Sequence, residues 1–230
     1  MNSSPAQPNQ SLIDGIEVLL AVARAPQPVG VRELGRELGM TPTRVQRFLG
    51  TLAHLGMTSR TDNRRYTVGP GIHSLSAISF SASGLAARAM TVLPALSDLD
   101  AVVALGVLWR GTVSYLYFSV PGIPSVKALG REEGYPARES SIGMLLLADK
   151  DADYLDRFFP EDRKRLGPQL KAVRANGFAT VHRPSSEISI AVPVGAPAFA
   201  GLAISGMFDE SDIPEIVGRL RQTAEDLAGT

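Results

Sequence analysis

The chain has 230 residues, of which 44% are hydrophobic and 20% charged, and its formal net charge is zero. This length suffices for one large domain or for two modest domains with cores of their own. There is no cysteine and only three scattered histidines, so disulfides, thiolate chemistry, a metal site and a cofactor are not predicted. The polar N-terminus and the lack of a bilayer-length apolar run predict a cytoplasmic protein without membrane contact.

Positive charge is concentrated in the first seventy residues. They carry eight arginines against five acidic side chains, and most of these arginines lie between Arg32 and Arg65. Arginine is suited to bidentate contacts with phosphate groups and guanine. Taken alone, this charge fits either nucleic-acid contact or solvated helix faces.

Two helices are predicted before residue 40. Ser11 and Asp14 read as a capping box at the start of the first helix, which ends before Pro26. The stretch "VRELGREL" (31–38) has the spacing of a second, short helix. The following "GMT" predicts a tight connection to a third helix.

The third predicted helix runs from Pro42 to Leu55. Thr41 is a good N-cap, Pro42 occupies the first helical position, and Gly56 is a C-cap candidate. An advance of about 100° per residue separates a buried stripe from a polar face. The stripe consists of Val45, Phe48, Leu49, Leu52 and Leu55, and the polar face of Thr43, Arg47, Gly50 and His54, flanked by Arg44, Gln46 and Thr51.

Two short helices joined by a glycine-containing turn form a helix-turn-helix unit, whose second helix reads the major groove. Two β-like runs, Met57–Arg60 and Arg65–Val68, follow with the turn signal "TDN" between them, and predict a basic hairpin, or wing. The order of these elements predicts DNA binding. The candidate contacts are Thr41, Thr43, Arg44, Gln46, Arg47, Thr51, Arg64 and Arg65.

The remaining residues predict a helix followed by an α+β domain. The Ser- and Ala-rich stretch from Ile72 to Ala89 has helical spacing and reads either as a plain linker or as a dimerisation helix. Helices are expected over 140–148, 151–159, 167–177 and 211–229, and strands over 101–109, 113–120, 125–130, 178–182, 188–195 and 199–208. We expect an antiparallel sheet with helices on one face and loops closing the other, an arrangement that often holds a small ligand.

The order of motifs from "LIDGIEVLLAV" to "RRYTVGPGIHSL" resembles the winged helix-turn-helix of the IclR (isocitrate lyase regulator) family of bacterial transcription factors. The second half resembles the effector domain of that family at Gly143, "RANGFA", "IAVPV" and "LAISG". The polar first ten residues predict a disordered tail (1–10). The helical and hairpin patterns predict a winged helix-turn-helix domain (11–70) and a linker helix (71–90), and the resemblance implies a GAF-like effector domain (91–230).

By position, the resemblance places effector contacts at Ser141, Ile142, Ser189 and Ser205, with Met144 as apolar wall where the family usually has lysine. Such hydroxyls suit a small organic acid, although serines near strand ends also bond their own backbone. Arg131 and Arg138 are further candidates for a carboxylate partner, or are solvated. The loop before "ISIAVPV" is shorter than is usual in the family and keeps one acidic residue, Glu187.

These features predict a ligand-responsive repressor or activator that binds operator DNA as a homodimer or a dimer of dimers. No catalytic residue is assigned, because the second half has no cysteine and its lysines show no Ser-x-x-Lys pattern. Two alternatives remain open: a ligand-independent DNA-binding scaffold with a degenerate pocket, and an enzyme with an appended DNA-binding domain. The sequence leaves the effector, the operator and the sign of regulation open.

Overall fold

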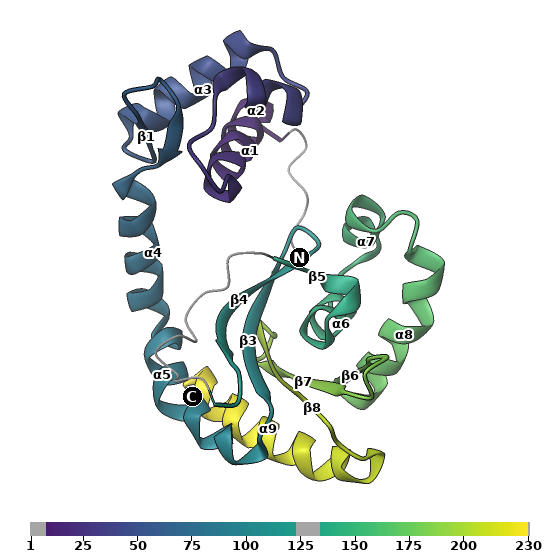
Figure 1. The fold of residues 1–230 in the computed structure, drawn as a ribbon. Helices are drawn as coiled ribbons and strands as arrows, with labels where there is room; N and C mark the ends of the chain where they lie inside the picture. The colour runs from purple at the N-terminus through teal and green to yellow at the C-terminus, as the bar shows by residue number, and fades with distance from the viewer. Residues whose placement is uncertain (1–7, 123–133, 230) are drawn as a thin grey trace. The chain divides into compact units, whose positions relative to one another are not determined.

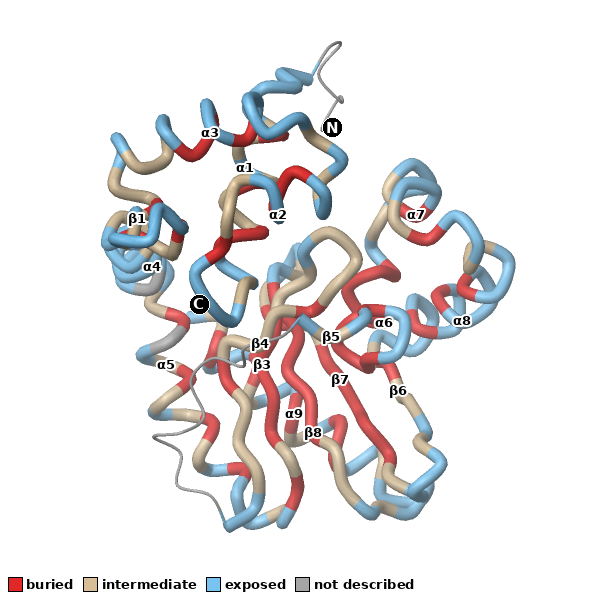
Figure 2. The backbone as a smooth tube through the Cα atoms, turned by 45° about the horizontal axis from the view of Figure 1, so that its top comes forward, coloured by how far each residue is buried: buried red, intermediate tan, exposed pale blue. Residues whose placement is uncertain are grey.

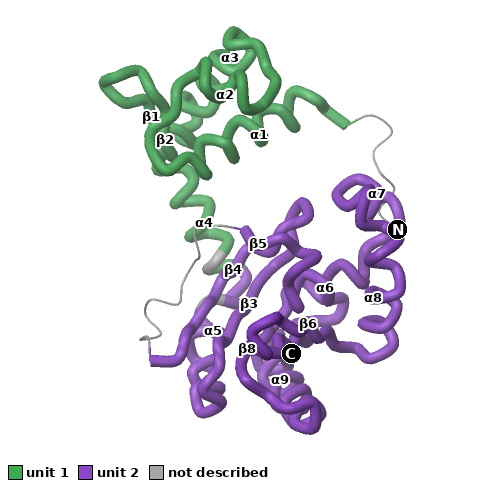
Figure 3. The backbone as a smooth tube through the Cα atoms, turned by 45° about the vertical axis from the view of Figure 1, so that its right-hand side comes forward, with its two compact units in different colours: residues 1–82 green, residues 83–230 purple. Residues whose placement is uncertain are grey.

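The computed structural model describes residues 8–122 and 134–229, apart from the side chains of Phe80 and Ala86. It divides the chain into two compact units, one ending at Ala82 and the other beginning at Ser83 (Figure 3). Of the tail predicted over residues 1–10, residues 1–7 lie outside the described residues. The first helix begins at Gln10, one residue before the predicted start at Ser11.

The first unit contains the predicted three helices and hairpin (Figure 1). Val18, Leu34, Val45 and Leu49 are fully buried at its centre and hold the three helices together. Val29 and Tyr66 exchange backbone hydrogen bonds of 2.8 Å, which tie the hairpin to the helices. The elements are α1 (Gln10–Arg24), α2 (Val31–Glu37), α3 (Pro42–His54), β1 (Thr58–Arg60), β2 (Tyr66–Val68) and α4 (Pro70–Ser83).

The helix ends in this unit agree with the sequence at α3 and differ at α1. Thr41 caps α3 as predicted, because its side chain accepts from the Arg44 backbone N–H at 3.4 Å. The capping box of Ser11 and Asp14 is wrong: Asn9 caps α1 by accepting from the Leu12 N–H at 3.1 Å. Asp14 lies one turn further on and points into the unit instead.

Leu55 does not belong to the buried stripe of α3 and is 59% exposed. The helix ends at His54; Leu55 is its C-cap, keeps helical backbone angles and lies on an exposed apolar surface together with Leu12 and Ile16 of α1.

The predicted continuous linker helix is broken at Gly84. This glycine has φ +60°, a left-handed conformation that costs other residues energy, and it separates α4 from α5 (Leu85–Val92). After the break, Leu85 and Ala89 are buried in the core of the second unit, and the Arg88 Nε donates to the Leu227 carbonyl at 2.7 Å. The stretch predicted as one linker is therefore shared between the two units.

The second unit is built on a six-stranded antiparallel sheet in the order β5-β4-β3-β8-β7-β6. The predicted hairpin is present, with β3 and β4 joined through Arg110 and Gly111. The candidate strand at 125–130 lies outside the described residues, and the short β5 pairs with the edge of β4. The strands are β3 (Val102–Trp109), β4 (Thr112–Ser119), β5 (Tyr135–Pro136), β6 (Ala179–His182), β7 (Ile188–Val194) and β8 (Ala200–Gly206).

Helices cover both faces of this sheet, whereas the sequence predicted helices on one face only. Nearly every residue of β7 is buried, so this strand has no solvent-facing side (Figure 2). On one face pack α6 (Ser141–Ala148), α7 (Ala152–Phe158) and α8 (Arg163–Asn176); on the other pack α5, the 3-10 helix η1 (Leu93–Leu99) and α9 (Ile213–Ala228).

We predict that Gly143→Ala destabilises the second unit. Gly143 lies in the buried helix α6, where an added Cβ would overlap the backbone of Ala137, which cannot yield as a flexible side chain would. The free energy of unfolding should fall by about 2–3 kcal/mol. Urea unfolding followed by circular dichroism measures the change.

The matched control is Gly218→Ala in α9, where no atom lies within 4 Å of the added Cβ. This change should raise stability by about 0.5–1 kcal/mol, because alanine favours the helix. Equal effects of the two substitutions would contradict the close packing of α6 on Ala137.

Candidate functional site

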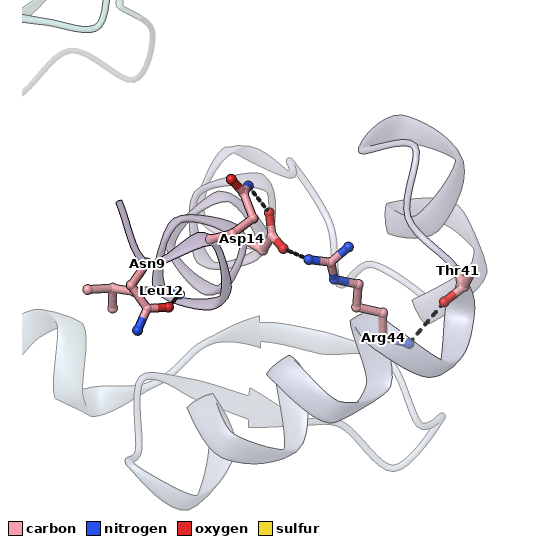
Figure 4. Close-up of polar contacts among 6 residues, drawn as sticks. Asn9, Leu12, Asp14, Thr41 and Arg44 are labelled. Atoms are coloured by element: carbon pink, nitrogen blue, oxygen red, sulfur yellow. Dashed lines mark hydrogen bonds and ion pairs between the residues drawn. The ribbon is translucent and has the colours of Figure 1, made fainter. Parts of the chain in front are cut away.

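Helix α3, which the sequence predicts to be the recognition helix, is held to α1 by a buried carboxylate. The Asp14 side chain is 7% exposed, accepts from the Gln10 amide at 2.8 Å, and forms an ion pair with the Arg44 guanidinium (Figure 4). A buried carboxylate is costly without a partner, so this pair fixes the position of α3. Arg44 was predicted to contact DNA; the structure shows its guanidinium turned back toward α1.

Two more of the predicted DNA contacts are engaged inside the first unit. The Arg65 guanidinium donates to the Glu33 carboxylate at 2.7 Å and to the Pro28 carbonyl, which ties the wing to the start of α2. The Gln46 amide donates to the Tyr66 hydroxyl at 3.0 Å, which ties α3 to β2. These contacts orient the wing and the recognition helix relative to each other.

Three predicted contacts have exposed side chains without a hydrogen-bonding or ionic partner in the described parts of the chain: Thr43, Arg47 and Arg64. Thr43 and Arg47 lie on the polar face of α3, and Arg64 lies in the wing turn with φ +58°. Of the remaining two, Thr41 is used as the cap, and Thr51 donates to the Arg47 carbonyl at 3.2 Å. The helix thus presents an arginine beside hydroxyl groups, which suits base edges and phosphates.

The second unit holds a cavity of about 270 Å³ between α6 and the ends of the central strands. Ser141, Ser189 and Ser205 meet at its floor. The Ser205 hydroxyl donates to Ser189 at 2.7 Å, and the Ser189 and Ser141 hydroxyls are 2.8 Å apart. Four of the five residues predicted for effector binding, the three serines and Ile142, are brought together here.

Met144 lies elsewhere. It is buried and lines a separate cavity of about 370 Å³ beside α8 and β6. Residues two apart on a helix differ by about 200° in direction, so Ile142 and Met144 cannot face one cavity. Arg138 also lines the second cavity and pairs with Glu139 and Asp162 at 3.3 and 3.5 Å. Arg131 lies outside the described residues.

A β-bulge supplies the aromatic wall of the serine cavity. The β3–β4 register shifts between Leu105 and Gly106, so Leu116 is an extra residue on β4. The shift turns Tyr115 and Phe118, which are three residues apart, to the same face, where their rings pack edge to face with centroids 5.4 Å apart. Strict alternation would place them on opposite faces, and so the sequence did not predict this wall.

Two charged side chains, Arg183 and Glu187, also line the cavity, and the sequence did not predict them as part of the site. Arg183 donates from Nη1 to the Tyr135 hydroxyl at 3.2 Å and lies over the Tyr135 ring, and Glu187 lines the same cavity. The hydrogen bond to Tyr135 raises the pKa of the Arg183 guanidinium, with a smaller contribution from Glu187. Arg183 and Glu187 flank the turn between β6 and β7, a position that motif spacing does not mark.

The described residues contain no group of three or more metal-binding side chains. Within those same residues, none of the helices combines the length and the apolar character that crossing a bilayer requires.

Residues 11–62 match the model of the IclR helix-turn-helix domain. The chain carries the helix-turn-helix domain of the IclR family. The resemblance drawn from the sequence motifs is thereby confirmed, and so is the α+β class with an N-terminal helix-turn-helix and a C-terminal antiparallel sheet.

Relatives extend the IclR likeness over nearly the whole chain. The HTH-type transcriptional regulator KdgR of Dickeya chrysanthemi is 25% identical, with 87% of this chain and 73% of that protein covered. An IclR family transcriptional regulator from Brucella abortus superimposes with a TM-score of 0.74 at 21% identity, over 97% of this chain and 93% of that one. An IclR homolog from Microbacterium hydrocarbonoxydans, solved with 4-hydroxybenzoate, gives 0.63 at 16% identity, over 95% and 97%.

We predict that Arg44→Ala destabilises the IclR-type helix-turn-helix unit. The substitution leaves Asp14 buried without its cationic partner, which should cost about 1–3 kcal/mol since Arg44 is 43% exposed. Hydrogen–deuterium exchange of α1 and α3 amides in the full chain measures the loss.

Two controls identify the cause. Arg47→Ala removes an arginine without an ionic partner and should change stability by less than about 0.5 kcal/mol. The double variant Asp14→Asn with Arg44→Ala should recover part of the loss, because no buried charge remains. Equal protection of α1 and α3 in the wild-type and Arg44→Ala proteins would show that the ion pair does not hold the helix.

Proposed function

We propose that this chain senses a small organic acid and changes its binding to operator DNA in response. Its class, an IclR-family transcriptional regulator with a DNA-binding helix-turn-helix, rests on the family match over residues 11–62. The observation that carries the sensing role is the convergence of Ser141, Ser189 and Ser205 in one cavity of the second unit. The protein would act in the cytoplasm, where operator DNA is found.

For DNA contact, we propose that the exposed side chains of α3 read bases and that the wing binds phosphate. Thr43 and Arg47 lie on the outward face of the helix that the ion pair of Asp14 and Arg44 fixes in place. Arg64 extends from the wing turn. Because Asp14 and Arg44 already hold the helix in place, DNA binding through Thr43 and Arg47 does not carry the entropic cost of ordering the helix.

For effector sensing, the cavity combines hydroxyl groups, aromatic rings and one arginine, the mixture found in ligand pockets. The Microbacterium homolog binds 4-hydroxybenzoate, an organic acid with a ring and a hydroxyl group. An open cavity of about 270 Å³ favours sensing over the alternative of a scaffold with a degenerate pocket. The regulator names of the relatives favour this role over that of an enzyme.

Regulation follows if the effector and the DNA prefer different conformations of the protein. The effector then shifts the DNA affinity by its own difference in affinity for the two conformations, and DNA shifts the effector affinity by the same factor. Because of this reciprocity, the change in effector affinity caused by DNA also measures the change in DNA affinity caused by the effector.

Assembly into at least a homodimer, or a dimer of dimers, is part of the proposal. Leu75 and Ile78 on α4 are 55% and 63% exposed, and Leu12, at 63%, and Ile16, at 42%, are exposed on α1. Apolar side chains that lie close together on a monomer mark interaction surfaces. Two copies would also match a two-fold operator, because one winged helix covers a single half-site.

We predict that Arg47→Ala weakens binding to a selected operator by about 1–3 kcal/mol, the cost of a lost base or phosphate contact. Arg64→Ala should weaken operator and random DNA alike and flatten the salt dependence, because it removes a phosphate contact. Fluorescence anisotropy over a range of salt concentrations measures both. A folded Arg47→Ala protein with unchanged operator affinity would show that this face of α3 does not contact DNA.

Light scattering should give a mass of at least twice the 24.5 kDa monomer at micromolar concentration. Replacing Leu75 and Ile78 together by serine should lower the mass toward that of the monomer, because the apolar face of α4 is lost. A monomer mass for the wild-type chain would contradict the assembly.

The double variant Ser141→Ala with Ser205→Ala should lose the effector response and keep its DNA affinity. It removes both ends of the hydroxyl chain while leaving the first unit untouched. Anisotropy titration of operator DNA with and without 4-hydroxybenzoate measures the response, and Ser211→Ala, at an exposed serine that lies just before α9 and outside the cavity, is the control. A full response in the double variant would exclude this cavity as the sensor.

A further inference from the structure

We propose that the effector is a monocarboxylate with a planar apolar body, bound with its carboxylate on Arg183 and an uncharged polar group on the serine chain. This inference rests on the proposed sensing function. It assigns ligand contacts to Arg183 and Glu187, and it sets the direction in which the ligand enters the cavity.

The serine chain has too few protons to hold a carboxylate. Each hydroxyl donates one hydrogen bond, and the three serines already make two bonds among themselves. Whichever of Ser141 and Ser189 donates to the other, one spare O–H donor remains in the chain, together with free acceptor lone pairs at Ser205. A carboxylate accepts several hydrogen bonds and donates none, whereas a hydroxyl group both accepts and donates and so matches one donor and nearby acceptors.

Arg183 has the donors that the serine chain lacks. Its guanidinium carries five N–H groups, and among the described residues its polar side-chain partner is the Tyr135 hydroxyl, bound at 3.2 Å. Tyr135 also lies under the guanidinium, with 5.7 Å between its ring centroid and Cζ, and so restricts where the fork points. A guanidinium held in this way binds a carboxylate through two parallel hydrogen bonds.

Glu187 limits the ligand to one negative charge. Its side chain lines the same cavity, accepts from the Ser185 hydroxyl at 3.0 Å, and lies near enough to Arg183 to affect it electrostatically. One carboxylate on the ligand can bond to Arg183, whereas a second would lie at the serine chain without a cationic partner and would add to the repulsion from Glu187. The charged side chains of the lining, one arginine and one glutamate, therefore offer a cationic partner to one carboxylate and to no second one.

The walls suit a flat apolar body between these two ends. Tyr115 and Phe118 present a tilted pair of rings on one side, and small side chains, Ala104 and Ala203, lie on the sheet. Ile142 closes the side of α6. An aromatic or conjugated ligand could pack on the two rings edge to face, as they pack on each other.

Calorimetry on the full chain without DNA tests the orientation with three probes of one shape. These are 4-hydroxybenzoate, its neutral amide 4-hydroxybenzamide, and terephthalate, which carries a second carboxylate in place of the hydroxyl. The wild-type chain should bind 4-hydroxybenzoate roughly 10- to 100-fold more tightly than the amide, the effect of a charged hydrogen-bonded pair. Terephthalate should bind more weakly than 4-hydroxybenzoate.

The Arg183→Gln variant should bind the acid and the amide equally. The matched control, Arg138→Gln, removes an arginine that lines the other cavity of the same unit and should keep the preference. Ser205→Ala should weaken both probes and also keep the preference, and Glu187→Gln should improve terephthalate. If Arg183→Gln does not fold, Arg183→Lys replaces it in the test. Lysine keeps the positive charge but lacks the two parallel N–H donors of the guanidinium, so it should reduce the preference for the acid over the amide without reversing it.

The proposal is overturned if the wild-type chain binds no 4-hydroxybenzoate at millimolar concentration, or if Arg183→Gln keeps the preference. Loss of the preference in Ser141→Ala alone would also overturn it, since the carboxylate would then lie at the N-terminus of α6. The proposed function fails separately: the expected binding pattern without any change in DNA affinity would contradict regulation and leave the Arg183 site standing. If 4-hydroxybenzoate released DNA equally from the wild-type and Arg183→Gln proteins, the result would support regulation and contradict the Arg183 site.

Discussion

The alternation of side chains along β7 and β8 is the constraint on which the second unit depends. Ile190, Leu202 and Ile204 point to one face and build the core under α9. Their neighbours on the other face are small, and at Gly201 an added Cβ would lie 2.9 Å from the Ile142 side chain. This face therefore lets α6 approach closely, and the Ser189 hydroxyl, to which Ser205 donates, meets Ser141, the first residue of that helix. One backbone geometry thus creates both the core and the floor of the cavity.

In the helix-turn-helix unit, a buried charge plays the corresponding part. Asp14 is held inside the unit by Arg44, and Arg65 bridges the wing to α2 through Glu33. Because those two arginines are used within the unit, its net positive charge comes from the others, of which Arg47 and Arg64 lie on the proposed DNA-binding side. Some arginines of the unit therefore hold its elements together, and others form an exposed basic face. Charge counts alone do not distinguish these two uses.

The break at Gly84 gives the two halves of the expected linker different tasks. The part before it, α4, keeps exposed apolar side chains and belongs to the first unit; the part after it, α5, contributes buried residues to the core of the second. Gly84, which has a left-handed backbone conformation, is the single residue that separates the two helices. The covalent connection between the unit proposed to bind DNA and the unit proposed to bind the effector is therefore short and passes through a glycine.

The sequence by itself determined the elements whose signals are local. The Thr41–Pro42 start of α3 and the Arg110–Gly111 hairpin turn depend on neighbouring residues, and the structure has both where the pattern indicated. The order of those elements, together with matching motifs, was enough to predict the IclR-type helix-turn-helix and the antiparallel sheet. The serines were placed in one cavity by resemblance of motifs, and the hydrogen bonds between them agree with that placement.

Only the tertiary structure decided which partners the side chains take across long distances. Asp14 and Arg44 are thirty residues apart, so the local pattern predicted a capping box at Ser11, and the buried ion pair forms only because α1 and α3 pack together. The bulge at Leu116 depends on how β3 pairs with β4, and it alone brings Tyr115 and Phe118 to one face. Arg183 and Tyr135 meet across 48 positions of sequence. A side chain's surroundings at such separations are set by the packing of whole elements, which local spacing does not encode.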